Sequence, residues 1–188
     1  MKKALKHIAS IQTGALLKTV SAGEIVYLQA KHFDENGMLN QLLHPDLNSA
    51  EISEKHLLRE DDVLFAAKGA KNFAACYDNK NQPAVASTSF FVIRIQGNLK
   101  DKILPQFLSW AINHPVSQKY LKANAIGSSI ASISKVVLAE LEISIPDLQT
   151  QKAILKIAEL RNREKKLKQE IEMLKEKQIL HQIINVIK

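Results

Sequence analysis

The sequence predicts an α/β (α+β) domain with a twisted mixed sheet, followed by a long C-terminal coiled-coil helix. Three observations support this fold class. Short alternating or β-branched runs dominate the first hundred residues, two helical patterns that begin at prolines follow them, and the tail carries a heptad pattern. A chain of 188 residues, 46% of them apolar, suits one domain plus an appendage, which we place at residues 1–146 and 147–188.

The first half of the chain is predicted to form short strands bounded by turn residues. The strand runs are KALKHIASI (3–11), IVYLQ (25–29), MLNQLL (38–43), DVLFAA (62–67) and ASTSFFVIRI (86–95). Asn36-Gly37 favours a tight hairpin after the second run, because both residue types tolerate positive φ values. We expect the runs at 62–67 and 86–95 to lie in the core of the sheet.

Short helices are expected after the strands. LPQFLSWAINH (104–114) and PVSQKYLKANA (115–125) each begin near a proline and place apolar residues three and four apart. A further short helix is expected after Ser132 or Ser134, where a serine can cap the first turn.

The tail begins abruptly. EISI (142–145) alternates like a strand, and Pro146 ends it because proline has no backbone N–H to donate. Asp147 is placed to cap a helix that begins at Leu148. Apolar residues then follow heptad spacing and form a seam that we expect to mediate dimerisation through Ile157, Leu160, Leu167, Ile171, Leu174, Leu180 and Ile184.

Glu164 is the one polar residue within the seam up to Leu174. The pattern resumes at Leu180 after a three-residue step at Lys177, which should overwind the helix locally. Residues 152–188 would span roughly 55 Å of helix, which is more than one small domain can cover. An apolar stripe can also pack a helix on its own domain, but this length favours pairing with a second copy or with another chain.

Charge and composition narrow the class of partner. The formal net charge is +7, which favours an anionic partner. Residues 152–188 hold ten Lys/Arg against five Asp/Glu, so the tail is the more basic part. The single cysteine, Cys76, allows no internal disulfide, and no apolar run approaches the length of a membrane span. We therefore expect a cytoplasmic protein with no membrane segment.

We predict no catalytic site, no metal site and no cofactor. The six histidines are scattered, and neither phosphate-binding glycine motif, GxxxxGK[ST] or GxGxxG, is present. Pro45-Asp46 and Asp78-Asn79-Lys80 can be written as the PD…(D/E)xK pattern of metal-dependent nucleases. That chemistry needs its second acid and lysine on a rigid strand, whereas residues 78–83 (DNKNQP) are typical of an exposed turn.

Polar and basic loops make nucleic acid a candidate partner. Lysines can neutralise phosphates, and Asn or Gln amides can pair with adenine edges. Loops of this composition are also ordinary protein surface, so they do not decide the partner alone. The candidate DNA-contact residues are Lys31, His32, Lys68, Lys71, Asn72, Asn79, Lys80 and Gln82.

The stretch GSSIASISKVVLAELEISIPDLQTQKAI (127–154) resembles the end of a target recognition domain and its helical spacer in type I restriction-modification specificity subunits. The family motif ends in an Ile-Pro-Pro-Leu-x-x-Gln-x-x-Ile junction. DDVLFAAKG (61–69) resembles the family's Gly-Asp-Val-Leu-x-x-x-x-Gly strand, with Asp61 where glycine is usual, and IVYLQAKHFDENGML and PAVASTSFFVIR resemble further family strands. Asp147 replaces the usual second proline of the junction, whose matching residues are Ile145, Pro146, Leu148, Gln151 and Ile154.

This resemblance implies a non-catalytic, sequence-specific reader of double-stranded DNA that docks methyltransferase (modification) and restriction subunits. A complete specificity subunit of this family holds two recognition domains and two spacers, so this chain looks like half of one, either a natural half-length subunit that dimerises or a truncated product. Two copies that pair their seams antiparallel would predict a symmetric, interrupted DNA site. The alternative is a helical adaptor that binds protein and has no DNA specificity.

Overall fold

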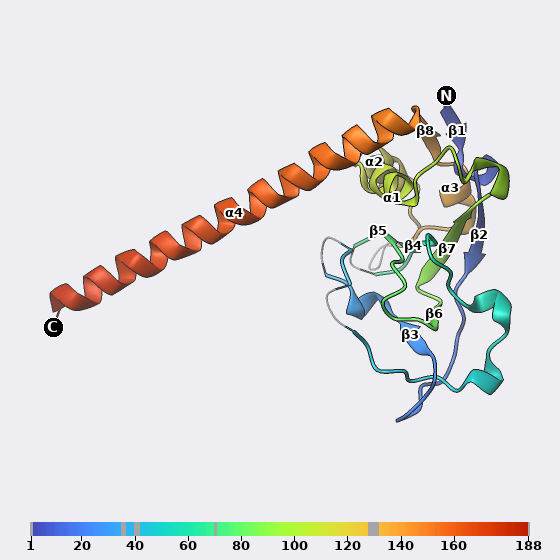
Figure 1. Ribbon diagram of the computed structural model, residues 1–188, viewed down its shortest axis with the longest axis horizontal. Coiled ribbons are helices and arrows are strands. Elements are labelled where there is room, and N and C mark those ends of the chain that lie inside the picture. The colour runs from blue at the N-terminus through green and yellow to red at the C-terminus, as the bar shows by residue number, and fades with distance from the viewer. Residues whose placement is uncertain (1, 35–36, 40–41, 70, 128–131, 188) are drawn as a thin grey trace. The chain divides into compact units, whose positions relative to one another are not determined.

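The computed structural model of the chain describes residues 2–34, 37–39, 42–69, 71–127 and 132–187 (Figure 1). The chain divides into two compact units, Met1–Gln151 and Lys152–Lys188. The first unit combines antiparallel and parallel strand pairs with short helices, and the second is the greater part of one long helix. The predicted α+β class with a long C-terminal helix is therefore confirmed.

A four-stranded antiparallel sheet forms the centre of the first unit (Figure 1). Its strands are, in order, β2 (Ala9–Thr13), β7 (Phe90–Ile95), β4 (Val63–Ala66) and β5 (Ala74–Cys76). Every residue of β4 is buried, which explains why this strand is a continuous apolar run. Helix α1 (Pro105–Asn113) packs against β5, and the amide of Asn113 both accepts from the N–H and donates to the C=O of Ala74, each at 2.7 Å.

Two further ladders complete the strand pairing. Strands β3 (Val26–Leu28) and β6 (Ala84–Ala86) pair in parallel, whereas β1 (Lys2–Ala4) pairs antiparallel with β8 (Glu142–Ser144). The parallel component of the predicted mixed sheet thus lies in a separate two-stranded ladder. The chain crosses over between β5 and β6, and β6 then runs in the same direction as β3.

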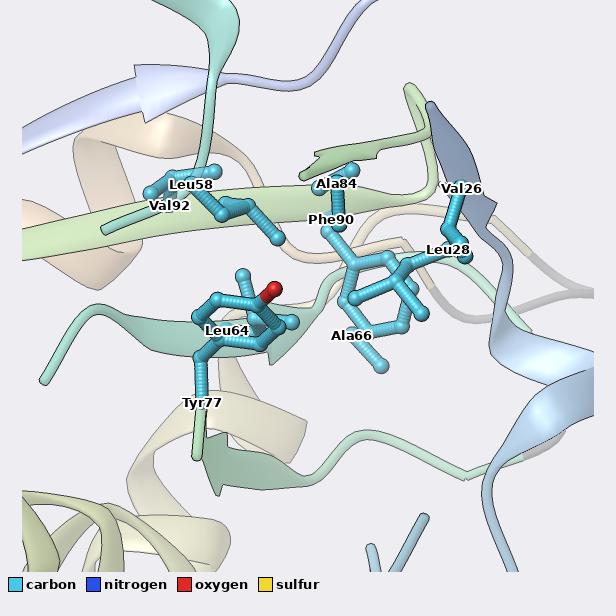
Figure 2. Close-up of a cluster of buried hydrophobic side chains, with 10 residues drawn as sticks. Val26, Leu28, Leu58, Leu64, Ala66, Tyr77, Ala84, Phe90 and Val92 are labelled. Carbon is cyan, nitrogen blue, oxygen red and sulfur yellow. The ribbon is translucent and has the colours of Figure 1, made fainter. Parts of the chain in front are cut away.

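One core cluster lies between the central sheet and the β3–β6 ladder (Figure 2). It contains one polar atom that lacks a hydrogen-bond partner, the hydroxyl oxygen of Tyr77. Phe33 and Phe73 pack against this cluster from outside and are half-buried. The buried members are Val26, Leu28, Leu58, Leu64, Ala66, Tyr77, Ala84, Ala86, Phe90 and Val92.

Most predicted elements are present. The run at 62–67 contains β4, and the two helices that begin at prolines are α1 and α2 (Pro115–Ala123). Helix α3 (Lys135–Ala139) begins after Ser134, whose hydroxyl accepts from the N–H of Val137 at 3.2 Å.

Three strand predictions differ from the structure. The run at 86–95 is divided, since β6 ends at Ala86 and β7 begins at Phe90. The run at 3–11 is interrupted by a 3₁₀ turn at Leu5–His7, between β1 and β2. Strand β5 was not predicted, because Ala74–Cys76 lacks the β-branched and aromatic residues that favour strands. Its pairing with β4 is imposed by the tertiary structure.

The predicted hairpin at Asn36-Gly37 falls partly outside the described residues, which do not include Asn36. Within them, Phe33 and Leu39 form a single antiparallel bridge, and Gly37 has a φ of 74°. A Cβ atom on Gly37 would lie 2.7 Å from Cδ2 of Phe73, so this position requires glycine for space as well as for conformation. The turn is therefore packed closely against Phe73.

The end of the first unit forms as the sequence predicts. Asp147 caps helix α4 (Leu148–Ile187), because its carboxylate accepts from the N–H of Thr150 at 2.9 Å and from the Thr150 hydroxyl at 2.8 Å. One turn later, the fully buried side chain of Gln151 donates to the carbonyls of Lys102 and Pro146, each at 2.8 Å. It also accepts from the N–H of Leu104 at 2.9 Å. The junction is thus held by one buried amide.

Within the second unit, α4 is a single helix whose predicted seam faces solvent. The exposed fraction of the seven seam side chains runs from 49% at Leu167 to 59% at Leu180. Some of its charged side chains form ion pairs with each other, such as Glu164 with Lys168 at 2.6 Å. No helix among the described residues is both long enough and apolar enough to cross a membrane.

Candidate nucleic-acid interface

The loop between β4 and β5 carries two lysines that were predicted to contact DNA, and hydrogen bonds hold its backbone. Lys68 and Lys71 are both exposed. Lys68 forms an antiparallel bridge with Ser132, and next to it the N–H of Ile133 donates to Ala67 O at 2.9 Å. Asn72 is half-buried, and its Nδ2 donates to Ala66 O at 2.9 Å. The amide of Asn72 therefore supports the loop, and the two lysines carry its accessible positive charge.

Aromatic contacts bring the segment after β3 to this loop. The ring of Phe33 lies 5.6 Å from that of Phe73 and 5.4 Å from that of Phe90, measured between centroids. Phe33 directly follows a 3₁₀ turn at Ala30–His32, so its ring contacts link the backbone that carries Lys31 and His32 to Phe73 at the end of the β4–β5 loop. Lys68, Lys71 and Asn72 lie on that loop itself.

His32 contributes hydrogen bonding and little positive charge at neutral pH. Burial lowers its pKa, and the nearby charge of Lys31 lowers it further, although Asp46 partly opposes the shift. Its Nδ1 accepts from the N–H of Gln29 at 3.2 Å, so the neutral ring closes the turn on which it lies. Of this pair, Lys31 is the exposed cation.

The other three predicted residues lie in the loop between β5 and β6, which starts at the opposite end of the β4–β5 ladder. Strand β5 runs back along β4, and the N–H of Tyr77 donates to Asp62 O at 2.8 Å. Lys80 pairs with Asp78 at 2.8 Å, and the Oδ1 of Asn79 is buried without a hydrogen-bond partner. Gln82 is exposed. Asn79, Lys80 and Gln82 therefore lie on a different loop from Lys68, Lys71 and Asn72.

The local charges in this second loop also cancel. Partial burial raises the pKa of Asp78, but the hydrogen bonds and charge of Lys80 outweigh that effect, so the net shift is downward. An ionised Asp78 next to Lys80 offsets part of the positive charge of this loop.

One segment at the interface was not among the predicted contacts. Ile126 and Ser132 exchange both backbone hydrogen bonds at 2.9 Å, and Ser132 bridges Lys68. Ile126 and Ser132 are thereby linked to the β4–β5 loop. The small polar residues Ser132 and Ser134 were the available signal, but the sequence pattern was interpreted only as a helix start near the end of the domain.

The residues of the nuclease-like pattern and the single cysteine have the following surroundings. Among residues 2–34, 37–39, 42–69, 71–127 and 132–187, no group of three His, Cys, Asp or Glu side chains could hold a metal ion. Of the nuclease-like pattern, Asp46 accepts from the N–H of Tyr27 at 2.8 Å and Asp78 pairs within its own turn. Burial raises the pKa of Cys76 to about 12, with Asp61 next in effect, so its thiol stays protonated.

Comparison with known proteins gives a consistent family. The chain matches the type I restriction modification DNA specificity domain over residues 1–173. No curated protein matches it in sequence.

Solved structures give the fold. The S subunit of a type I restriction-modification system from M. genitalium has a TM-score of 0.60 at 16% identity, covering 87% of this chain and 39% of that chain. The HsdS subunit from Thermoanaerobacter tengcongensis has a TM-score of 0.64 at 18% identity, covering 89% of this chain and 43% of that chain. A chain from a study of complex assembly in the type I R-M system has a TM-score of 0.68 at 18% identity, with coverage of 90% and 44%. This chain thus spans about two-fifths of the length of these proteins, and on the family match over most of its residues it belongs to the type I restriction modification DNA specificity domain family.

Proposed function

We propose that this chain is the sequence-specific DNA-recognition subunit of a type I restriction-modification complex. In this proposal it is non-catalytic, works in the cytoplasm without a cofactor, and docks methyltransferase and restriction subunits that carry the enzymatic activities. The observation that supports DNA binding best is the exposure of Lys68 and Lys71 on the loop between β4 and β5, in a chain that belongs to a DNA specificity family.

The arrangement suggests a division of roles at the interface. Exposed lysines would neutralise phosphates, which sets register and affinity without reading sequence. Base reading would then depend on amide and backbone groups of the adjoining loops, because bidentate pairing needs groups held in fixed positions. The packing of Gly37 and Phe33 on Phe73 supplies such rigidity.

We propose further that two copies pair through α4. The chain spans about two-fifths of its structural relatives, and its seam is exposed along four heptads. An apolar stripe of that length is typical of a helix that pairs with another helix. A two-fold dimer would carry two recognition units and would bind a symmetric, interrupted DNA site.

The test of DNA binding is the paired substitution Lys68→Ala and Lys71→Ala. Each lysine that contacts a phosphate contributes about −0.9 to the slope of log K against log salt, so the slope should become shallower by about 2. Affinity should fall on all sequences alike, because phosphate contacts carry no sequence information. Fluorescence anisotropy on labelled duplexes at several salt concentrations measures both quantities.

The matched control is Lys100→Ala with Lys102→Ala. These exposed lysines follow the C-terminal end of β7, whereas the β4–β5 loop lies near its N-terminal end at Phe90. The control should retain the wild-type slope. An unchanged slope in the Lys68/Lys71 variant would remove those residues from the interface.

A helical adaptor that binds only protein is the second candidate, and the exposed seam of α4 is the observation that favours it. Retention on duplex DNA separates the two functions. Wild-type chain that elutes from DNA at the same low salt as a neutral protein of similar size would support the adaptor and exclude the DNA reader.

A further inference from the structure

The polar residues within the seam of α4 carry information about pairing direction. Glu164 and Lys177 occupy seam positions. Their side chains have opposite charges, and both are exposed. All seven apolar seam side chains are also about half exposed. A polar residue at a seam position weakens a coiled coil but specifies its register, because only a suitable partner satisfies it.

The seam is close to symmetric about Ile171. At about 1.5 Å per residue, Glu164 lies roughly 10 Å before Ile171 and Lys177 lies roughly 9 Å after it. Apolar positions are similarly spaced, with Leu167 and Leu174 nearest to Ile171, Leu160 and Leu180 further out, and Ile157 and Ile184 at the ends. A second copy running in the opposite direction would therefore place each seam residue opposite its symmetry mate.

We infer that α4 pairs with a second copy of this chain in an antiparallel register centred on Ile171, in which Glu164 of each copy faces Lys177 of the other. This inference rests on the proposed dimer with antiparallel seams and adds its register. Each apolar seam residue then meets an apolar residue, and the two polar positions form two symmetry-related ion pairs.

Parallel pairing of the two helices in the same register would be energetically unfavourable. It would place Glu164 opposite Glu164 and Lys177 opposite Lys177, so that like charges meet at both polar positions. A shift of one seam position in the antiparallel pair would set Glu164 against an apolar residue. Charge complementarity therefore favours a single arrangement among those that bury the same apolar stripe.

Interactions on the same helix do not remove this preference. Glu164 already pairs with Lys168, one turn along the helix, but 61% of its side chain remains exposed. Its oxygens can accept from a second ammonium group, since a carboxylate has several acceptor sites. Within the part of the chain that the structure describes, no ion pair includes Lys177, and the pair that precedes it on the helix joins Glu172 and Lys175.

Charge exchange in the full chain tests the register. Glu164→Lys and Lys177→Glu should each raise the dimer dissociation constant about tenfold, since two attractive contacts become repulsive at once. The double variant should return it to within about threefold of wild type. Glu172→Lys and Lys166→Glu make the same charge changes on the outward face of the helix, and they should have little effect. Sedimentation equilibrium measures the dissociation constants of these five variants and of wild type.

Crosslinking gives a second measurement that does not depend on charge. In a Cys76→Ser background, I157C chains mixed with I184C chains should form a disulfide dimer, whereas neither should do so alone. In the antiparallel register two copies of position 157 lie about 40 Å apart. Efficient crosslinking of I157C chains alone would overturn the inference in favour of parallel pairing.

The outcomes separate this inference from the proposed function. A dimer in which the double charge exchange fails to restore affinity would overturn the register and leave the dimer standing. A wild-type chain that stays monomeric at tens of micromolar would overturn both the register and the homodimer, while DNA binding by the first unit is measured independently through its salt slope.

Discussion

The buried side chain of Gln151 offers the sharpest test of how the first unit ends. Its amide makes three hydrogen bonds of 2.8 to 2.9 Å, to Lys102 O, Pro146 O and the N–H of Leu104. Gln151→Leu keeps a similar volume but leaves these three backbone groups without their partner. Each lost bond costs about 1 kcal/mol, so we expect the free energy of unfolding to fall by about 2 to 3 kcal/mol.

Urea denaturation followed by fluorescence of Trp110 measures this loss. Trp110 is the single tryptophan, and its ring stacks on Phe107 within α1, with 5.7 Å between ring centroids. It therefore reports on the unit that holds Gln151. The matched control is Gln149→Leu, since Gln149 lies in the same turn of the helix and is exposed. This control should change stability by less than about 0.5 kcal/mol.

A second variant distinguishes hydrogen bonding from packing. Gln151→Glu can still accept from Leu104, but its carboxylate cannot donate and would face two carbonyl oxygens. It should therefore destabilise the protein at least as much as the leucine variant. The reasoning would be refuted if Gln151→Leu unfolded within about 0.5 kcal/mol of wild type, because the three bonds would then contribute nothing measurable.

Two further predictions concern groups in the first unit. Tyr77→Phe should raise stability by about 1 kcal/mol, because it removes a buried hydroxyl without a hydrogen-bond partner; a loss of stability in urea denaturation would mean that the hydroxyl has one. The pKa of His32 is lowered in the folded protein. The contribution of its neutral ring to the free energy of unfolding is therefore complete above the pKa of about 6.5 in the unfolded chain, and it is lost as pH falls through the pKa in the folded protein. The stability difference between wild type and His32→Gln should therefore shift against wild type between about pH 7.5 and pH 5, and a difference independent of pH would contradict the assignment.

The candidate interface was only partly predictable from the sequence. Lysines and amides in loops can be identified as candidates by chemistry alone, but their grouping depends on strand direction. Because β5 returns along β4, the loop at Asn79 and Lys80 begins at the far end of the ladder from Lys68. The contacts of Phe33 with Phe73 and Phe90 link segments far apart in the chain, and no local pattern encodes them.

One departure from the family pattern also acquires a structural reason. Asp61 stands where the resembling family motif has glycine, and its φ is 71°. Glycine adopts such a conformation without strain, whereas aspartate is among the few other residues that tolerate it. This position of the motif therefore corresponds to a backbone conformation with positive φ, which the structure shows and the sequence alone does not.

The sequence alone determined the features that depend on neighbouring residues. Pro146 ends a strand, Asp147 caps a helix within one residue of it, and heptad spacing defines the seam of α4, because each follows from local backbone chemistry or helical period. Only the tertiary structure decided that an alanine-rich segment becomes β5 and that Gln151 is buried. Strand pairing and burial depend on which distant segments meet, and that information is spread over the whole chain.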